Sequence, residues 1–306
     1  MKIRVLGSSA GGGFPQWNCG CANCAGLRRG AIRAVARTQE SVAVGAQPNG
    51  GWLVINASPD IGRQIESFPP LHPRGLRHSP VCGIVLTNGD LDHCLGLLCL
   101  REDQPLVVFA TERVWSSFAE SNALSRTLRR YPGHVEWRRL VLGVEQRVDL
   151  GGDFGPTFTL MPLEVPGKVP LHLRGAATHA EDNIGLLVKE TRSNVAMLYL
   201  SNVGEKFSGV ESLLSNADCI FFDGTFWTSD ELIRLGVGSR RAEDMAHWPL
   251  SGNDGSLALL ERFPDRRRVL IHINNTNPIL REDSPERRRV DQSGVVVAED
   301  GLEIDL

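Results

Sequence analysis

The fold of this chain is decided by the segment 83–93, which reads Gly-Ile-Val-Leu-Thr-Asn-Gly-Asp-Leu-Asp-His. Its apolar run, Gly83–Leu86, shows no alternation, which is typical of a strand covered on both faces. Two carboxylates and an imidazole follow, and alternation along an extended loop directs Asp90 and Asp92 to one side. A helix cap would account for one aspartate, but not for two aspartates and a histidine. We therefore expect Asp90, Asp92 and His93 to bind a metal ion.

Pieces with the character of strands and of helices alternate on both sides of this segment. The strand-like pieces are short, rich in Val, Ile and Leu, and bounded by Gly, Pro or Asn. Strands are predicted at Lys2–Leu6, Ser41–Val44, Trp52–Asn56, Gly83–Thr87, Leu106–Ala110, Thr157–Pro162, Gly185–Lys189, Ala196–Ser201, Cys219–Asp223 and Val269–Ile273. Helices are predicted at Pro59–Phe68, Leu95–Arg101, Glu112–Glu120, Lys206–Ser215, Ser229–Leu235, Ser256–Arg262 and Ser284–Asp291.

The two halves of the chain have a similar make-up, because each combines a set of strands with helices that can cover it. This pattern predicts an α/β fold, a four-layer αββα sandwich, in a single domain over residues 1–306. Two separate domains are the alternative. The segment Arg126–Gly155 is the candidate hinge between them, but it lacks the Pro and Ser content of a linker.

The composition excludes several classes of protein. Hydrophobic residues make up 42% of the 306 residues, so the chain can bury a substantial core. The balance of 33 basic and 36 acidic residues argues against nucleic-acid binding. No stretch approaches the roughly 20 apolar residues that span a bilayer, and the N-terminal segment lacks the features of a signal peptide. We therefore expect a cytoplasmic protein without a membrane segment, whose arginine runs at 266–268 and 287–289 face solvent.

The cysteines form a cluster and a scattered remainder. Seven is an odd number, so complete pairing within the chain is excluded. Cys19, Cys21 and Cys24 have the spacing C-x-C-x-x-C, which in a reducing compartment indicates metal binding. We expect a structural Zn²⁺ on these thiolates, with His247, Asn275 or water as the fourth ligand; a redox-active C-x-x-C is the alternative. The other thiols lie in apolar runs and are predicted to be buried: Cys82, Cys94, Cys99 and Cys219.

Further polar residues stand where predicted strands begin or end, and such loops gather functional groups. His272 follows a strand and suits a metal ligand or a core histidine equally well. Asp223 closes another strand and suits a functional acid or a turn residue equally well. His179 lies in a polar loop, and His247, beside a glycine-rich loop, is a candidate for acid–base chemistry. The remaining histidines are predicted at the surface: His72, His78, His134 and His172.

Four strings spread over the whole chain carry a family resemblance. They are GSSAGGGFPQWNCGCANC at 7–24, NASPD at 56–60, DGTFW at 223–227 and HINNTNP at 272–278. These strings are long and specific, and they resemble the B family of pyrroloquinoline quinone (PQQ) biosynthesis proteins, within the metallo-β-lactamase superfamily. The resemblance implies the αββα sandwich. It also implies a metal-binding loop, which reads His-x-His-x-Asp-His in most superfamily members.

The chain departs from the superfamily pattern of two metals. The loop here reads Asn88-x-Asp90-x-Asp92-His93, so both leading histidines are absent. By the resemblance, His179 and Asp182 stand where a further histidine ligand falls, and Asn202 stands where a metal-bridging aspartate falls. A neutral amide is a poor bridge, so these departures weaken the interpretation as a dizinc hydrolase.

The second metal position of the superfamily is retained. Asp92, His93 and His272 give one carboxylate and two imidazoles, the ligand set of many Fe(II) oxygenases, with Asp90 as an extra ligand or outer partner. The resemblance implies a role in PQQ biosynthesis. The leading hypothesis is O₂-dependent hydroxylation, at Fe(II) or another divalent metal, of the tyrosine ring in a Glu–Tyr precursor derived from the PqqA peptide. His247, Asp223 and His179 would then position the substrate or move protons.

Two other functions are alternatives. The depleted metal loop favours a carrier that takes PQQ or its precursor towards the periplasm. A dinuclear metallohydrolase with unusual ligands is the other alternative. The expected partners are the precursor, other PQQ biosynthesis proteins and a second copy of the chain in a homodimer, with no nucleic acid among them.

Overall fold

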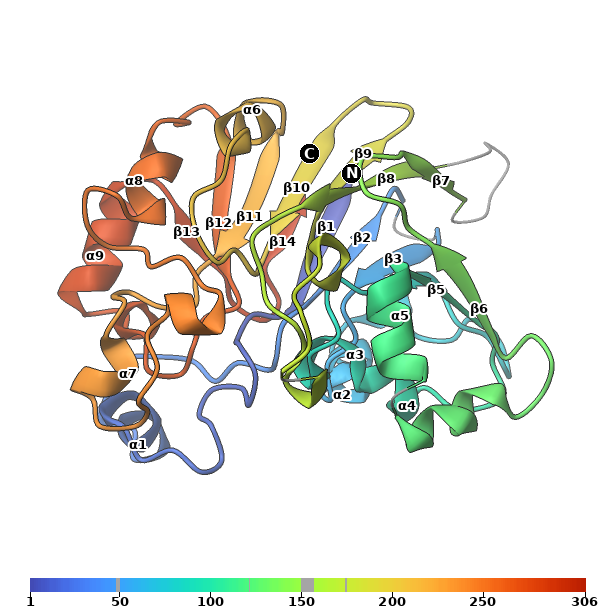
Figure 1. Cartoon of the computed structure of the whole chain (residues 1–306), viewed down its shortest axis with the longest axis horizontal. Coiled ribbons are helices and arrows are strands. Elements are labelled where there is room, and N and C mark those ends of the chain that lie inside the picture. The colour runs from blue at the N-terminus through green and yellow to red at the C-terminus, as the bar shows by residue number, and fades with distance from the viewer. Residues whose placement is uncertain (48–49, 121, 150–156, 174) are drawn as a thin grey trace.

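The computed structural model describes residues 1–47, 50–120, 122–149, 157–173 and 175–306, and in them the strands form two seven-stranded sheets (Figure 1). The first sheet has the order β14-β1-β2-β3-β4-β5-β6, with β14 Glu303–Asp305, β1 Lys2–Gly7, β2 Ser41–Gly45, β3 Trp52–Ile55, β4 Val81–Val85, β5 Leu106–Ala110 and β6 Val135–Arg139. The second has the order β13-β12-β11-β10-β9-β8-β7, with β13 Val296–Val297, β12 Arg267–Ile271, β11 Cys219–Asp223, β10 Ala196–Leu200, β9 Ile184–Glu190, β8 Phe158–Glu164 and β7 Gln146–Val148.

Helices cover the outer face of each sheet (Figure 1). Beside the first sheet lie α2 Ile61–Glu66, α3 Leu91–Cys94, α4 Gly96–Cys99 and α5 Glu112–Ala119. Beside the second lie α6 Val210–Ser215, α8 Ser256–Glu261 and α9 Pro285–Gln292. The helices α1 Ala22–Arg28 and α7 Glu231–Arg234 lie at one end, where residues of both line one pocket. Among the described residues, no helix combines the length and the apolar composition that crossing a bilayer requires.

Three layers of apolar side chains hold the sheets and helices together. Phe109 and Val5 of the first sheet meet Phe158 and Phe221 of the second in a central layer. A second layer joins the first sheet to α2, α4 and α5, and a third joins the second sheet to α6, α8 and α9. Helix, sheet, sheet and helix thus follow one another, which confirms the predicted four-layer sandwich. Because both sheets contribute to one central layer, we propose that residues 1–306 form a single domain.

The parallel strands place functional loops at a common edge. β3 to β6 run parallel in the first sheet, and β10 to β13 run parallel in the second. The carboxyl ends of parallel strands meet at one edge of a sheet, where loops build binding sites. Asp223 is paired with Ile271 in the register of β11 and β12, so the residue that follows β12, His272, emerges directly beside it.

The segment predicted as a hinge is the connection between the two sheets. Of Arg126–Gly155, the described part contains β6 and β7, an edge strand of each sheet, and residues 150–155 lie outside the described residues. The predicted helix Leu95–Arg101 is the shorter helix α4, Gly96–Cys99, and a separate short helix, α3, precedes it at Leu91–Cys94. Gly96 stands at their junction, and its amide donates to the carbonyl of Ala57 at 2.8 Å.

Several burial predictions were wrong. Cys94 and Cys219 are buried as expected, whereas Cys82 is half-buried and Cys99 is exposed, since it lies at the end of the short α4. His134, predicted at the surface, is fully buried and stacks on Tyr131. His72 is half-buried, and His78 and His172 are exposed.

One arginine of the basic runs is also buried. Arg268 is 5% exposed, and its guanidinium donates to the carbonyls of Leu260, Arg266 and Gly294. Arg267 and Arg268 are the first two residues of β12, which lies next to the edge strand β13. Successive side chains of a strand point to opposite sides, and here Arg267 is exposed whereas Arg268 is buried.

Candidate metal centre and its cavity

Asp92 and His93 of α3 meet His272, which follows β12, so each sheet contributes to one cluster of ligand atoms. Nε2 of His272 lies 3.2 Å from Nε2 of His93 and 3.4 Å from Oδ2 of Asp92. Nε2 of His93 lies 3.6 Å from the same carboxylate oxygen. His272 has a φ of 58°, a left-handed conformation in which its backbone turns sharply at the end of the strand.

The three ligand atoms have the spacing that a single metal ion requires. Ligands at about 2.0–2.2 Å from an ion and separated by tetrahedral or near-octahedral angles lie roughly 3–3.5 Å apart. The observed edges of 3.2, 3.4 and 3.6 Å match this spacing. Two imidazoles and one carboxylate also suit Zn, Mn and Fe(II), so the residues fit a mononuclear site with open positions.

Outer partners fix the ring of His93. Its Nδ1 lies 3.4 Å from Oε2 of Glu40 and 3.4 Å from the hydroxyl of Thr87. Glu40 is buried and also accepts a hydrogen bond from Asn56 at 2.9 Å. A partner on Nδ1 holds the proton there and leaves the lone pair of Nε2 free for a metal. Burial raises the pKa of Glu40 to about 7.

A second set of partners fixes His272. Its Nδ1 lies 2.9 Å from the hydroxyl of Thr225, which donates to Oδ1 of Asp223 at 2.6 Å. The proton of His272 therefore resides on Nδ1, and its Nε2 faces the other ligands. Asp223 is fully buried, and its oxygens also accept hydrogen bonds from the backbone amides of Val203 and Thr225. Asp223, His247 and His272 also form a group whose ligand atoms lie within 4.8 Å of one another. Because the oxygens of Asp223 already accept these bonds, we expect it to support the centre rather than to bind the ion.

Asp223 also holds His247. Nδ1 of His247 lies 2.7 Å from Oδ2 of Asp223, and the ring stacks on His272 with a centroid separation of 5.3 Å. His247 is buried but lines the same cavity as the ligands, and its Nε2 has no hydrogen-bond partner among the described residues, so it offers a basic atom beside the metal centre. Burial, aided by the charges of His272 and Lys168, lowers the pKa of His247 despite the attraction of Asp223.

The charges of the cluster suit a divalent cation. Burial lowers the pKa of His93 to about 4, so this ring is neutral near pH 7 and can donate its lone pair. Burial opposes ionisation of Asp92, but the imidazoles of His93 and His272 outweigh it and hold its pKa below the usual range. The pKa of His272 is raised, because the Asp92 carboxylate outweighs the opposite effect of burial.

A cavity of about 880 Å³ opens beside these ligands. Its wall includes Ala10, Gly11, Gln16, Asn18, Cys19, Gly20, Asp90, Leu91, Lys168, Leu171, His172, Asn202, Thr225, Leu232, Val237, Arg240, Met245, His247, Asn274, Asn275 and Thr276. Asn202 is 8% exposed, and its Oδ1 has no hydrogen-bond partner among the described residues. A buried amide without a partner is costly, so this group is available to a ligand in the cavity.

Asp90 and His179 lie apart from the cluster. The Asp90 carboxylate accepts a hydrogen bond from the amide of Leu171 at 3.0 Å, so it anchors a neighbouring segment. His179 is exposed, its Nδ1 accepts from the amide of Glu181, and it lines a separate cavity of about 770 Å³. Asp182 pairs with Arg113 at 3.0 Å. In the described part of the chain, the converging ligand groups around His272 include none of these residues.

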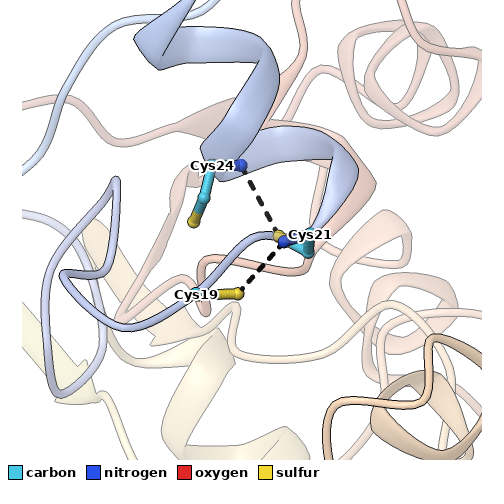
Figure 2. Close-up of side chains that lie close together, drawn as sticks. All are labelled: Cys19, Cys21 and Cys24. Atoms are coloured by element: carbon cyan, nitrogen blue, oxygen red, sulfur yellow. Dashed lines mark hydrogen bonds between the residues drawn. The ribbon is translucent and has the colours of Figure 1, made fainter.

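The cysteine cluster forms a second centre. Figure 2 shows Cys19 on the loop before α1, and Cys21 and Cys24 at the first turn of this helix. The three Sγ atoms lie within 4.8 Å of one another. The amide of Cys24 lies 3.5 Å from Sγ of Cys21, and that of Cys21 lies 3.4 Å from Sγ of Cys19, bonds that favour thiolates.

Asn275 closes this cluster. Its side-chain amide lies 3.1 Å from Sγ of Cys19, 3.7 Å from that of Cys21 and 3.3 Å from that of Cys24. The two ends of an asparagine amide are assigned from its neighbours, so a carboxamide oxygen fits the same place. Three sulfurs and one oxygen at this spacing suit tetrahedral Zn²⁺. Of the expected fourth ligands, Asn275 is in place, whereas His247 is bonded to Asp223.

Several supporting residues were not predicted from the sequence. Glu40 and Thr225 contact the ligand histidines, and Lys168 lines the cavity. Glu40 and Lys168 belong to none of the quoted motifs, and Thr225 lies in the string DGTFW without having been assigned a role. Glu40 directly precedes the fully buried strand β2, and a lone acid at the start of such a strand was the available signal.

Comparison with known proteins agrees with this geometry. Residues 51–273 match the model of the β-lactamase superfamily domain. Coenzyme PQQ synthesis protein B of Azotobacter vinelandii is 42% identical, and that of Pseudomonas savastanoi pv. phaseolicola is 43% identical, each over 100% of both chains.

Solved structures show the same relationship. The crystal structure of Zn²⁺-bound PqqB from Methylobacterium extorquens is 39% identical, with a TM-score of 0.90 over 100% of both chains. A diphosphatase from the PhnP family shares the fold at 20% identity, with a TM-score of 0.66 over 100% of this chain and 97% of that one. The chain belongs to the coenzyme PQQ synthesis protein B family, in the β-lactamase superfamily.

Proposed function

We propose that this protein catalyses an iron- and O₂-dependent hydroxylation in PQQ biosynthesis, on the tyrosine ring of a cross-linked Glu–Tyr precursor. The observation that carries the proposal is the cluster of Asp92, His93 and His272, whose ligand atoms face a cavity of about 880 Å³. Fe(II) on this set would supply binding and activation of O₂ beside an electron-rich ring. Cytoplasmic localisation is part of this proposal.

His247 is the proton acceptor in this scheme. A free phenol has a pKa near 10, so it stays protonated at pH 7 unless a base removes its proton. The lowered pKa keeps the imidazole of His247 neutral, and Asp223 at 2.7 Å stabilises the imidazolium that forms. Deprotonation raises the electron density of the ring carbons, where the new C–O bond forms.

The remaining bonds must balance. One oxygen atom of O₂ enters a ring C–H bond as hydroxyl, and the other leaves as water. This outcome requires two electrons and two protons from outside the ring, so we propose a soluble reductant of the ascorbate or thiol class as co-reactant. The Asn202 amide has a free oxygen at the cavity wall and suits hydrogen bonding to the substrate.

The test uses the metal-loaded protein, Fe(II), a reductant and the precursor with and without O₂. We expect oxygen from ¹⁸O₂ to appear in the product and turnover to stop under anaerobic conditions. An Asp92→Ala variant is the matched control, because it removes the carboxylate ligand. Undiminished turnover without O₂ contradicts the proposal.

A dinuclear hydrolase is less well supported by the contacts. At the first position of the loop, Asn88 uses its side-chain oxygen to accept the amide of Asp90 at 2.9 Å, and its side-chain nitrogen faces Asn183. The side-chain amide of Asn88 is therefore already used in hydrogen bonds and is not positioned to bind a second metal ion. Metal analysis separates the alternatives: a hydrolase of this kind needs two ions besides the cysteine-bound zinc, and the hydroxylase needs one.

A carrier of PQQ or its precursor is the second candidate, and the large cavity favours it. A carrier would bind its cargo tightly without metal-dependent turnover. A variant with both Asp92→Ala and His93→Ala that still supports PQQ formation in cells would favour the carrier over any enzyme at this centre.

A further inference from the structure

A segment of the chain, residues 166–173, lies along one side of the cavity and is fastened at both ends. The carbonyl of Pro166 accepts a hydrogen bond from the amide of Gly204 at 2.8 Å. At the other end, the amide of Leu171 donates to Asp90 at 3.0 Å, and Nε2 of His172 lies 3.1 Å from the carbonyl of Ser117. This segment is therefore held in place before any ligand enters.

Lys168 lies between these fastenings and lines the cavity. Its side chain is 25% exposed, and its Nζ lies 3.9 Å from Oδ2 of Asp90, at the outer limit of an ion pair. Asp90 already accepts the amide of Leu171 through its other oxygen. The ammonium group thus has room for a second anionic partner in the cavity.

Arg240 lines the same cavity from the segment between α7 and the short helix Glu243–Met245. Within the described ranges, its guanidinium makes no ion pair or side-chain hydrogen bond, whereas the guanidinium of Arg234 in the same region lies 3.9 Å from the carboxylate of Asp230. Its neighbours on the cavity wall include apolar Leu232, Val237 and Met245.

Among the described residues, the acids of the cavity wall leave Arg240 without an ion-pair partner and leave Lys168 with only its 3.9 Å contact to Asp90. Of the lining residues, Asp90 and Asp92 are the acids, and Asp92 belongs to the metal cluster. A bound divalent ion would neutralise Asp92 further. A cavity of about 880 Å³ also exceeds the needs of one aromatic ring, since pockets of about 300–1,000 Å³ hold ligands of drug size.

We propose that Lys168 and Arg240 bind carboxylates of the substrate, so that the site selects a phenol carrying at least two acidic groups. This inference rests on the proposed function for the identity of the ring, but the binding of carboxylates is tested separately from turnover. Lys168 acts from the fastened segment and Arg240 from the segment after α7. Both are specificity residues, and neither contacts the reacting atoms in this scheme.

The test measures binding of three dipeptides to the protein as purified, without O₂, by titration calorimetry. Glu-Tyr has two carboxylates, Gln-Tyr has one, and Gln-Tyr amide has none. We expect the wild type to bind Glu-Tyr most tightly. Lys168→Met should weaken Glu-Tyr binding about tenfold to hundredfold, as for a half-buried charged hydrogen bond, and leave Gln-Tyr amide unchanged. Arg240→Met should weaken the binding of Glu-Tyr by up to about fivefold, because this side chain is exposed.

Matched variants control for charge and structure. Lys206 is the control for Lys168, because it pairs with Glu211 at 3.9 Å, the same distance as Lys168 from Asp90, but does not line the cavity. Arg241 is the control for Arg240, because it is the next residue in the chain and does not line the cavity. Lys206→Met and Arg241→Met should bind all three dipeptides as the wild type does. Lys168→Arg should restore most of the affinity for Glu-Tyr.

Three outcomes would overturn the inference. The first is an equal loss of affinity for all three dipeptides in the variants, which would indicate a structural role of the two cations. The second is unchanged affinity for Glu-Tyr in both methionine variants. The third is a wild type that does not prefer Glu-Tyr. This experiment measures binding and not turnover, so it is independent of the hydroxylation assay. If the protein distinguishes the dipeptides but does not hydroxylate the precursor, the proposed function is refuted and this inference is still supported.

Discussion

The Nδ1 atom of His272 lies 2.9 Å from the hydroxyl oxygen of Thr225, which donates its own proton to Asp223. This contact determines which nitrogen of the ligand histidine carries the proton. Loss of such a partner typically lowers metal affinity tenfold to hundredfold.

Thr225→Val keeps the shape of the side chain and removes the hydroxyl. We expect the affinity of the Asp92–His93–His272 centre for its metal to fall about tenfold to hundredfold, while the cysteine-bound zinc stays. Competition with a chromophoric chelator measures both ions. Thr127→Val is the control, because the hydroxyl of this half-buried threonine donates to a nearby carbonyl, that of Leu124, and Thr127 lies outside both centres. Equal metal affinity of Thr225→Val and the wild type would contradict the assignment.

The two centres should lose their metals separately in variants. His272→Ala removes a ligand of one centre and should reduce the metal content by one ion. Cys24→Ser should remove the structural zinc and lower Tm by at least about 5 °C, because such a site contributes folding free energy. Metal analysis and calorimetry of both variants test this. Retention of full zinc by Cys24→Ser would exclude the cysteine centre as a zinc site.

Stability should depend on pH through His93. Burial lowers its pKa to about 4, whereas an unfolded histidine titrates near 6.5. As the pH falls below about 6.5, the unfolded chain binds a proton that the folded metal-free protein does not, so the free energy of unfolding decreases. The contribution is about 2 kcal/mol at pH 5.

His93→Gln removes this titration. Urea unfolding of the metal-free wild type and variant at pH 7 and pH 5 gives the comparison. We expect the wild type to lose more stability than the variant over this interval, and parallel losses would show that His93 titrates normally.

Turnover should depend on the proton acceptor. His247→Gln keeps a polar side chain but cannot accept a proton, and we expect kcat to fall about 10²- to 10⁴-fold. In the wild type, the lowered pKa of His247 places the acid limb of the rate profile below pH 6.5. His78→Gln, at an exposed histidine, should retain wild-type rates. An acid limb above pH 6.5 would argue against His247 as the base.

The glycine after α3 should be essential for stability. A Cβ atom on Gly96 would lie 2.2 Å from the carbonyl oxygen of Ser58 and 2.6 Å from that of Ala57, and both are backbone atoms. Gly96→Ala should therefore destabilise the protein by more than about 2 kcal/mol. Gly62, in α2, has open space at the same atom, and Gly62→Ala should be neutral or stabilise by about 0.5–1 kcal/mol. Urea unfolding of the two variants provides the measurement.

Local sequence patterns predicted the helices and strands that have a distinct apolar run or periodicity of their own. β11 has the bounds Cys219–Asp223 that its apolar run indicates, and β5 agrees as well. β6 and α1 were missed. β6 has alternating charged residues at an edge, and α1 begins among the cysteines, with Cys24 inside it, and has no apolar stripe. The break at Gly96 depends on Ala57, a contact between distant segments that no local pattern reveals.

The same limit applies to the site. Asp92 and His93 are adjacent in sequence, and a polar cluster after a buried strand identified them. His272 was ambiguous from its local sequence, and the register of β12 beside β11 brings its ring close to Asp92 and His93. Glu40 contacts His93 from another strand end, so only the folded sheet brings them together. His179 lines a cavity separate from the one at the metal centre, and its local sequence gave no indication of this.

The short segment from His272 to Asn275 has a consequence for assembly. It supplies a ligand to one centre and the closing amide to the other, within four consecutive residues. An ion in the cysteine cluster therefore holds the backbone of this segment in the conformation that His272 requires. The conformational entropy of ordering the segment is lost when the first ion binds and is not lost again when the second binds. A metal in one centre should therefore raise the affinity of the other without being required for it, so either ion can be lost alone, and whichever ion a cell delivers first eases the binding of the second.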